Sequence, residues 1–534
     1  MLLALQTAET SGEEPELEVV QWLLGVMAML APDGVARIML PDNDGGLDIA
    51  LQRCVEGSLL SWSVNGDVVV MHRLLARVLR ERAHATHTLG RLGADAAAVI
   101  TPLLFDESEA FRRREEGSRL VDHIEALWEA VNNILDFDVL TAALSARRWA
   151  IRQLIESAEL ARATNLARHI VAAHEQILGD HHPETLNARQ NLAYAYHWAE
   201  RLPEAITLYE QILADRVRML GPEHPDTLTS RHDLANTYES AGQLTEAITF
   251  YELSLADRVR ILGPDHPDTL HSRNNLANTY RSAGRLSEAV SLYQRNLDAR
   301  ERVLGLDHLD TLTSRGNLAN AYHSAGRLSE AITLHEQVLA DRVRVLGPDH
   351  HHSLVSRGSL ANAYRSAGRV SEAVTLCARR LADSERLLGL DHPDTLSSRS
   401  GLASAYRSAG RVTEAIALLE KNLTDTERLL GPDHPNTMDS RSHLAGTYMS
   451  AERVSEGISL LELSLTDHER VLGASHPYTL SPRNNLAYAY EFVGRVAEAI
   501  VLYEQNFTTA ERTLDSGHPD ITIYRDNLLR LRHQ

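Results

Sequence analysis

Cysteine and long apolar runs are scarce in this chain of 534 residues, and each scarcity excludes a class of protein. The two cysteines, Cys54 and Cys377, are too few and too far apart for a disulfide framework or a zinc cluster. The best apolar run, Val19 to Leu30, is shorter than the roughly 20 residues that cross a bilayer. The start, MLLALQTAET, has no basic segment typical of a secretion signal. We therefore expect a cytoplasmic protein without a membrane partner.

Clustered positive charge is also missing. The formal net charge is -20, and neither a basic tail nor an arginine stripe interrupts the scattered acidic residues. Such a surface repels phosphate backbones, so nucleic acid is not an expected partner. Aromatic residues make up 5% of the chain and hydrophobic residues 43%, which favours a folded protein built by packing alanine- and leucine-rich helices.

A repeat with a constant period of 42 residues runs from about residue 179 to the end. The same spacing relates an arginine, a Leu-Ala pair and a glycine in each of eight units. The glycines are Gly179, Gly221, Gly263, Gly305, Gly347, Gly389, Gly431 and Gly473.

Each unit predicts a hairpin of two helices, as in the segment from His266 to Gly305. Pro267 suits the first turn of a helix, and Gly284 suits the left-handed residue that ends one. A second helix is predicted from about Ser287 to Gly305. One hairpin cannot bury its apolar stripe alone, so the units must stack into a superhelix.

The predicted fold is therefore all-α, a superhelical solenoid with a small domain before it. We expect a helical connector over residues 91–157. The solenoid over residues 158–534 would comprise a half unit, eight full units and a C-terminal capping helix. Residues 1–90 lack the repeat and form the separate domain.

The arrangement small-Leu-Ala, Tyr, Ala-Gly, Glu-Ala, Tyr resembles tetratricopeptide repeats, in the 42-residue form found in kinesin light chains and in bacterial signalling proteins. The resemblance covers about two-thirds of the chain and recurs in register. It implies a concave groove that binds a protein or an extended peptide, and no cofactor.

The segment from Ala50 to Ala83 reads as helix, strand, turn at Asn65-Gly66, strand and helix. This outline resembles the winged-helix end of the NB-ARC module in STAND-type signalling ATPases, which often precedes such repeats in bacteria. In that family a Gly-Lys-Ser/Thr loop binds ATP phosphates. Lys421 is the sole lysine here and lies within a repeat, so no ATPase activity is expected and the region is interpreted as a remnant of the module.

Polar residues occupy the predicted groove face of the first helix in each unit. Asparagine offers a donor and an acceptor together, so a row of them could hold the main chain of an extended peptide. The alternative is that the amides only tie neighbouring helices together. The candidates are Asn191, Asp233, Asn236, Asn275, Asn278, Asn317, Asn320 and Asn362.

A second row carries positive charge at Arg281, His323, Arg365 and Arg407. It predicts a preference for acidic peptides, unless these side chains are solvated and paired with nearby carboxylates. Lysines of the carboxylate-clamp type are missing, which disfavours chaperone tails as partners.

Other recurring residues are assigned structural roles. The histidine of each unit, from His182 to His518, precedes a proline or its equivalent and is interpreted as the residue at the helix start, not as a metal ligand. Cys377 fills a core position. The repeated arginine, such as Arg273, is predicted to form a structural ion pair with Asp257 or its equivalents.

The sequence thus predicts a non-enzymatic scaffold or signalling adaptor that binds a peptide or protein. The alternative is a sensor arm that holds a STAND-type ATPase, supplied by another chain, inactive. No convergent polar constellation suggests an enzyme.

Overall fold

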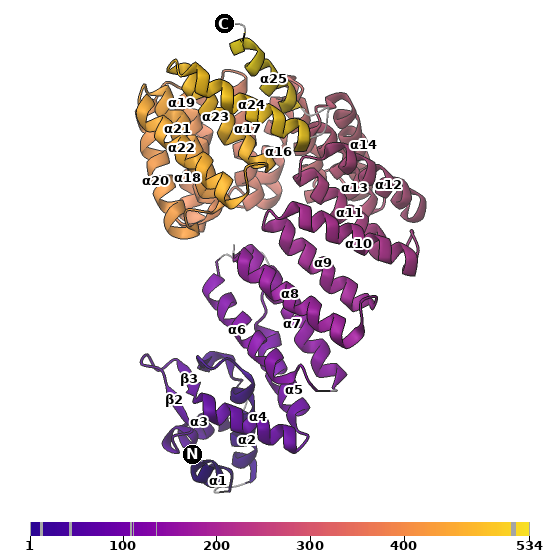
Figure 1. Cartoon of the computed structure of the whole chain (residues 1–534), viewed down its shortest axis with the longest axis vertical. Helices are drawn as coiled ribbons and strands as arrows, with labels where there is room; N and C mark the ends of the chain where they lie inside the picture. The colour runs from indigo at the N-terminus through magenta and orange to yellow at the C-terminus, as the bar shows by residue number, and fades with distance from the viewer. Residues whose placement is uncertain are drawn as a thin grey trace. The chain divides into compact units, whose positions relative to one another are not determined.

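The computed structural model describes residues 2–10, 14–41, 45–106, 109–110, 112–134, 136–157, 159–513 and 519–532, and nearly all of them are helical (Figure 1). Two compact units make up the chain, Met1–Arg201 and Leu202–Gln534. The predicted all-α repeat fold, preceded by a small domain with a strand hairpin, is confirmed. None of the described helices combines the length and the apolar character needed to cross a bilayer.

The N-terminal unit contains nine α-helices, two short 3-10 helices and three strands among its described residues. In chain order they are α1 Leu2–Thr10, α2 Glu14–Met29, β1 Val35–Ala36, η1 Arg37–Met39, α3 Gly46–Glu56, β2 Leu60–Trp62, β3 Val68–Met71, α4 Arg73–Ala85, α5 Leu89–Ile100, η2 Thr101–Leu103, α6 Arg114–Val131, α7 Phe137–Glu156, α8 Leu160–Leu178 and α9 Pro183–Trp198.

The three strands form an antiparallel sheet in the order β1-β3-β2. Val69 in the central strand is opposite Val35 on one side and Trp62 on the other. Gly66 has a φ of 74°, a value that favours glycine, at the predicted turn between β2 and β3. The predicted order of helix, strand, turn, strand and helix is confirmed by α3, β2, β3 and α4.

Polar contacts fix α6 within the unit. His123 Nδ1 accepts a hydrogen bond of 3.1 Å from the Ala31 backbone N–H, and burial lowers the pKa of His123 to about 4. The guanidinium of Arg147 on α7 donates to Glu125 at 2.7 Å and stacks over the ring of Trp128 at 4.6 Å. These contacts join α6 to the end of α2 and to α7.

The C-terminal unit alternates two kinds of helix. The A helices are α11 Pro225–Ser240, α13 Pro267–Ser282, α15 Leu309–Ser324, α17 His351–Ser366, α19 Pro393–Ser408, α21 Pro435–Ser450 and α23 Pro477–Phe492. The B helices are α10 Leu202–Leu220, α12 Leu244–Leu262, α14 Leu286–Leu304, α16 Leu328–Leu346, α18 Val370–Leu388, α20 Val412–Leu430, α22 Val454–Val471 and α24 Val496–Thr513. The final helix is α25 Pro519–Arg532.

A histidine caps the start of every A helix. His266 is extended, and its Nδ1 accepts a 3.2 Å hydrogen bond from the backbone N–H of Asp268, while Pro267 is the first helical residue. The same cap recurs from His224 to His476, and His518 lies outside the described residues. The predicted role of these histidines at the helix start is confirmed.

Glycines end both helices of a hairpin, and a small-residue seam packs them together. Gly284 follows α13 with a φ of 73°, and Gly305 ends α14 with a φ of 88°. Between the helices Ala277, Ala289 and Tyr293 are almost completely buried. This seam repeats along the unit and forms its core.

The repeated arginine of most A helices forms an ion pair, but the predicted ion pair was wrong for Arg273. Asp257 pairs with Arg231, which lies 26 residues earlier in the same hairpin. Arg273 instead donates to the Pro264 carbonyl at 3.1 Å, because Ala299 occupies the position where its own aspartate would be.

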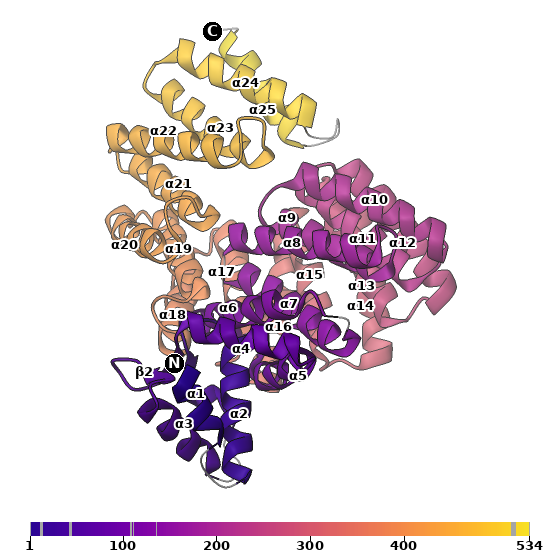
Figure 2. The ribbon, with the colours of Figure 1, turned by 60° about the horizontal axis from the view of Figure 1, so that its bottom comes forward.

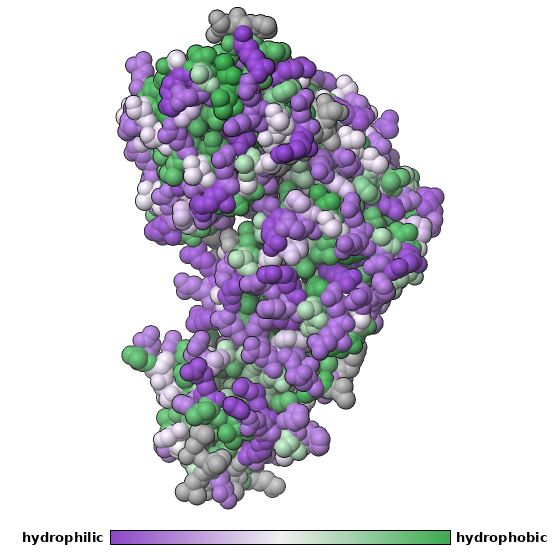
Figure 3. Space-filling model, in the orientation of Figure 1, coloured by the Kyte–Doolittle hydropathy of each residue, from purple (hydrophilic) through white to green (hydrophobic). Residues whose placement is uncertain are grey.

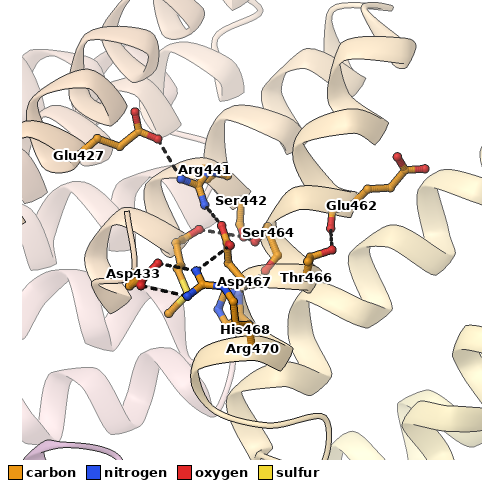
Figure 4. A network of polar contacts seen from close by, with 11 residues as sticks. Glu427, Asp433, Arg441, Ser442, Glu462, Ser464, Thr466, Asp467, His468 and Arg470 are labelled. Atoms are coloured by element: carbon orange, nitrogen blue, oxygen red, sulfur yellow. Dashed lines mark hydrogen bonds and ion pairs between the residues drawn. The ribbon is translucent and has the colours of Figure 1, made fainter. Parts of the chain in front are cut away.

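Figure 4 shows the most buried version of this ion pair. Arg441 donates to Asp467 at 2.5 Å and to Glu427 of the preceding repeat at 2.8 Å. Arg470 bridges Asp467 and Asp433 at 3.0 Å each. Because Arg441 is 3% exposed and Asp467 is 11% exposed, each charge has lost most of its contact with water and is stabilised by the other.

Candidate functional site

The C-terminal unit curves, and the A helices lie on the inner side of the curve (Figure 2). Most of the predicted groove residues therefore lie on this face, from Asp233 on α11 to Arg407 on α19. Asn191 is different, because it lies on α9 in the N-terminal unit.

One row of the predicted amides ties neighbouring A helices together. This tie row comprises Asp233, Asn275 and Asn317, which are partly buried. The amide nitrogen of Asn317 donates to Asn274 of the preceding repeat at 2.8 Å. That of Asn275 lies 3.2 Å from His232 Nε2, and burial lowers the pKa of His232 to about 3, so the neutral ring accepts the bond. The side chains of Asn275 and Asn317 thus serve the packing of adjacent repeats.

A second row presents its amides to solvent, and we name it the donor row. Within it, the hydroxyl of Tyr251 donates to Asn236 Oδ1 at 3.3 Å, and the hydroxyl of Tyr293 donates to Asn278 Oδ1. A tyrosine hydroxyl that donates to the oxygen sets the orientation of the amides of Asn236 and Asn278. The donor row comprises Asn236, Asn278, Asn320 and Asn362.

The amide nitrogens of the donor row have no hydrogen-bond acceptor among the described residues. Asn236, Asn320 and Asn362 are exposed, and Asn278 is partly buried. At Asn362 the donor to the amide oxygen is an arginine and not a tyrosine, because Arg365 donates to Asn362 Oδ1 at 3.0 Å. The amide oxygen is thus held at Asn236, Asn278 and Asn362, and Asn320 lies exposed at the equivalent position of its own repeat.

The four predicted cationic residues divide into two pairs. Arg281 contacts the Tyr293 hydroxyl and faces Glu239. Burial raises the pKa of the Glu239 carboxyl, and the charge of Arg281 offsets part of this increase. Burial lowers the pKa of His323, which hydrogen-bonds to the Ser366 hydroxyl at 2.9 Å.

The second pair comprises Arg365 and Arg407, and neither forms an ion pair with a described carboxylate. Their uncompensated charges lie on α17 and α19, beside the end of the donor row. Positive charge on this face is therefore concentrated in two adjacent repeats.

Arg380 is a further arginine close to the inner face of α17 that the sequence analysis missed. It lies on the B helix α18, but its Nη1 atom would be 2.5 Å from a Cβ added at Gly358 on the inner face of α17. In the neighbouring hairpin the equivalent residues, Asn422 and Ser400, form a 3.0 Å hydrogen bond. A glycine 22 residues before an arginine was the signal, because the missing side chain leaves room for this guanidinium, which is partly buried, and burial lowers the pKa of Arg380.

Nucleophilic or metal chemistry finds no support in the described residues. The thiol of Cys377 is buried in the core, and burial raises its pKa, which disfavours the reactive thiolate. In the described part of the chain, no three His, Cys, Asp or Glu side chains are grouped so that they could hold a metal ion.

The last full repeat departs from the polar pattern of the inner face. At the donor-row position α23 has Tyr488, and Phe492 follows one turn later, with exposures of 59% and 61%. Figure 3 shows apolar side chains gathered at this end of the C-terminal unit, over α23 and α24. The polar surface therefore ends before the final hairpin.

Comparison with known families agrees with the repeat geometry. A family model described as tetratricopeptide repeat matches residues 191–258, 235–295, 274–342 and 437–512. A second model with the same description matches residues 353–394 and 395–436, and together the matches span more than half of the chain. The chain belongs to the tetratricopeptide repeat family. No curated protein matches it.

Several solved tetratricopeptide repeat structures are similar to parts of this one. A putative kinesin light chain from Podosopora anserina with nearly identical TPR-like repeats is 36% identical, covers 39% of this chain and 98% of its own, and has a TM-score of 0.34. The quorum sensor NprR from B. thuringiensis is 14% identical, with coverages of 67% and 96% and a TM-score of 0.44. A STAND protein with a tetratricopeptide repeat sensor from Pyrococcus horikoshii is 12% identical, with coverages of 96% and 65% and a TM-score of 0.39.

Proposed function

We propose that the inner face of α11–α19 binds an extended peptide through its main chain. The observation that carries this proposal is the donor row, whose amide N–H groups have no acceptor among the described residues. An extended peptide offers carbonyl oxygens along its length, and main-chain hydrogen bonds give affinity that does not depend on side chains. Concave binding surfaces are a general use of repeat solenoids.

Within this groove we propose a preference for peptides with acidic side chains near α17 and α19. The supporting contrast is between two sets of arginines on the same repeats. Arg369 and Arg411 each pair with a glutamate three residues later, whereas Arg365 and Arg407 have no described carboxylate partner. Unpaired guanidinium groups bind carboxylates strongly, often through two parallel hydrogen bonds.

The donor row is tested with a peptide selected from a displayed library of random 12-residue sequences on the full chain. Changing Asn236, Asn278, Asn320 and Asn362 together to alanine should weaken binding at least about tenfold, because several hydrogen bonds are lost. Fluorescence anisotropy of the labelled peptide measures the affinity. The matched control changes Asn275 and Asn317 to alanine, which should lower stability and leave the peptide affinity nearly unchanged.

The charge preference has its own matched pair. The double variant Arg365→Gln with Arg407→Gln should bind an acidic peptide more weakly than the native chain does. Added salt should reduce this difference in affinity. Arg369→Gln with Arg411→Gln removes the same net charge from outside the groove and should have little effect. Equal losses in the two double variants would show that only the overall charge matters. Unchanged affinity in the quadruple asparagine variant would refute the groove itself.

As the alternative role, we propose a sensor arm that restrains a STAND-type ATPase supplied by another chain. The order of α3, β2, β3 and α4 supports it, since this is the outline of a winged helix in residues 1–90. Co-purification from the native cytoplasm followed by mass spectrometry should then recover an ATPase that contains a Gly-Lys-Ser/Thr loop. Recovery of peptide or protein partners without such an ATPase would leave the scaffold role.

A further inference from the structure

The N-terminal unit contains a pocket that the groove does not use. It has a volume of about 300 Å³ and lies among α6, α7, α8 and α9. Its walls are mainly aliphatic and aromatic, and it includes Asn191 at one side. The apolar residues that line it are Trp128, Leu140, Leu144, Ile170, Ile177 and Leu178.

The size of this pocket suits a small ring system. An engineered apolar cavity of about 150 Å³ binds benzene, and natural ligand pockets begin at about 300 Å³. A pocket of about 300 Å³ therefore has room for a molecule of one or two fused rings. Trp128, which is 7% exposed, forms part of the lining and offers a ring surface for contact.

One polar group lies deep among the apolar side chains. His174 is 6% exposed, and its Nδ1 donates to the Ile170 carbonyl at 2.7 Å. Burial lowers the pKa of His174, so the ring is neutral and Nε2 keeps its lone pair. Among the described residues Nε2 has no donor, and His174 lines the pocket. The site therefore presents a single buried acceptor to a ligand.

The exposed part of the lining is polar. Arg148 and Glu184 carry opposite charges, and Thr141 and Ser145 are uncharged. Ile177 is the exposed apolar residue of the lining, at 50%. A protein partner that inserted an aromatic anchor would need a broader apolar rim, since such anchors lie at the centre of a packed and desolvated interface. A free small molecule needs only the enclosed walls.

We propose that this pocket binds a small uncharged aromatic molecule of the phenol or indole class, with its O–H or N–H donated to His174 Nε2. The ring then lies among Trp128, Leu144 and Ile170. This site is separate from the donor row, so it does not depend on the proposed peptide groove. A ligand here would stabilise the packing of α6–α9 by binding only the folded state.

Isothermal titration of the full chain with indole and with 1-methylindole tests the hydrogen bond. The two probes differ in the N–H that His174 would accept, and leaving a buried acceptor unpaired costs enough to weaken binding about tenfold. In His174→Phe an aromatic ring remains and the acceptor is lost, so the ratio of the affinities for indole and 1-methylindole should fall to about one. Circular dichroism checks that this variant is folded.

A second pair of variants tests the location. Leu144→Trp should fill the pocket and abolish indole binding, whereas Ala161→Trp, an exposed position on α8 outside the lining, should leave it intact. No binding of indole or phenol at millimolar concentration would overturn the proposal. So would equal affinity for indole and 1-methylindole in the native chain. Capture of tryptophan-containing peptides without any binding of free indole would replace it with a partner-anchor site.

Discussion

The hydroxyl of Tyr448 donates a 2.7 Å hydrogen bond to the carboxylate of Glu420, which lies 28 residues earlier in the preceding repeat. Arg453 stacks over the ring of Tyr448 at 4.0 Å and lies 3.7 Å from the same carboxylate. This cluster joins two repeats through a phenol, a carboxylate and a guanidinium. The same tyrosine-to-glutamate bond recurs between other neighbours, including Tyr490 and Glu462.

Removing this hydroxyl should loosen the junction between the two repeats. We expect Tyr448→Phe to lower the free energy of unfolding by about 1 kcal/mol, the usual net contribution of a hydrogen bond, and somewhat more because the acceptor is charged. Urea denaturation followed by circular dichroism measures it. Tyr406→Phe is the matched control, because Tyr406 also stacks with an arginine at 4.0 Å but faces Ala378 where a glutamate would be. Equal losses in both variants would contradict the assignment.

The buried ion pair of Figure 4 should contribute more than the exposed one beside it. Asp467→Asn leaves the charge of Arg441, which is 3% exposed, without its closest carboxylate, so we expect a loss of about 3 kcal/mol. Asp433→Asn breaks a pair in which both side chains are 52% exposed, so its loss should stay below about 1 kcal/mol. Thermal and urea unfolding compare the two variants. Similar losses would show that burial does not govern these pairs.

The exception at Arg273 offers a stabilising substitution. Ala299 is 4% exposed and occupies the position that Asp257 and Asp341 hold in the neighbouring hairpins, where they pair with Arg231 and Arg315. We expect Ala299→Asp to raise the free energy of unfolding by about 1 kcal/mol through new pairs with Arg273. Ala299→Asn has the same shape without the charge and should give no gain. A loss of stability in Ala299→Asp would mean that desolvation outweighs the new pair.

Acid should destabilise the hairpin that contains His335. This side chain is 3% exposed, and burial lowers its pKa from 6.5 to about 4. Between these values the unfolded chain binds a proton that the folded chain does not, so stability is lost as the pH falls from about 6.5 toward 4. At pH 5 the loss reaches roughly 2 kcal/mol.

His335→Leu should remove this part of the acid sensitivity, because leucine occupies the equivalent core position at Leu419. The measurement is the difference in free energy of unfolding between pH 7.5 and pH 5 for the native chain and the variant. An unchanged difference would assign the acid sensitivity to other groups, such as His232.

Much of the fold could be predicted from the sequence because it depends on local signals that recur. The proline after His266, the glycine at 284 and the alanines of the seam each act within a few residues, so the helices were expected close to where they lie. The ion pairs were harder, because their partners lie 14, 26 or 37 residues away. The partner of Arg273 was wrong for this reason, since a single alanine changed what that arginine contacts.

The contacts of the candidate site were harder to predict from the sequence than the fold. The sequence places Asn275 and Asn278 on the same face, but it does not show that Asn275 is used by His232 while Asn278 is oriented by Tyr293. That difference depends on hydrogen bonds between residues of different helices. The pocket near His174 was missed because part of its wall comes from α6 and α7, which lie outside the clear repeat and carry no periodic signal.

The donor row has a consequence for how a bound chain could move. Its four amides are chemically the same and are separated by one repeat each. A peptide with a uniform main chain then meets an equivalent set of bonds after a shift of one repeat, so a short ligand has several registers of nearly equal energy. Translation by one repeat then exchanges one register for another at little net cost in free energy. The unpaired guanidinium groups near its end break this symmetry and act as a stop that selects one register.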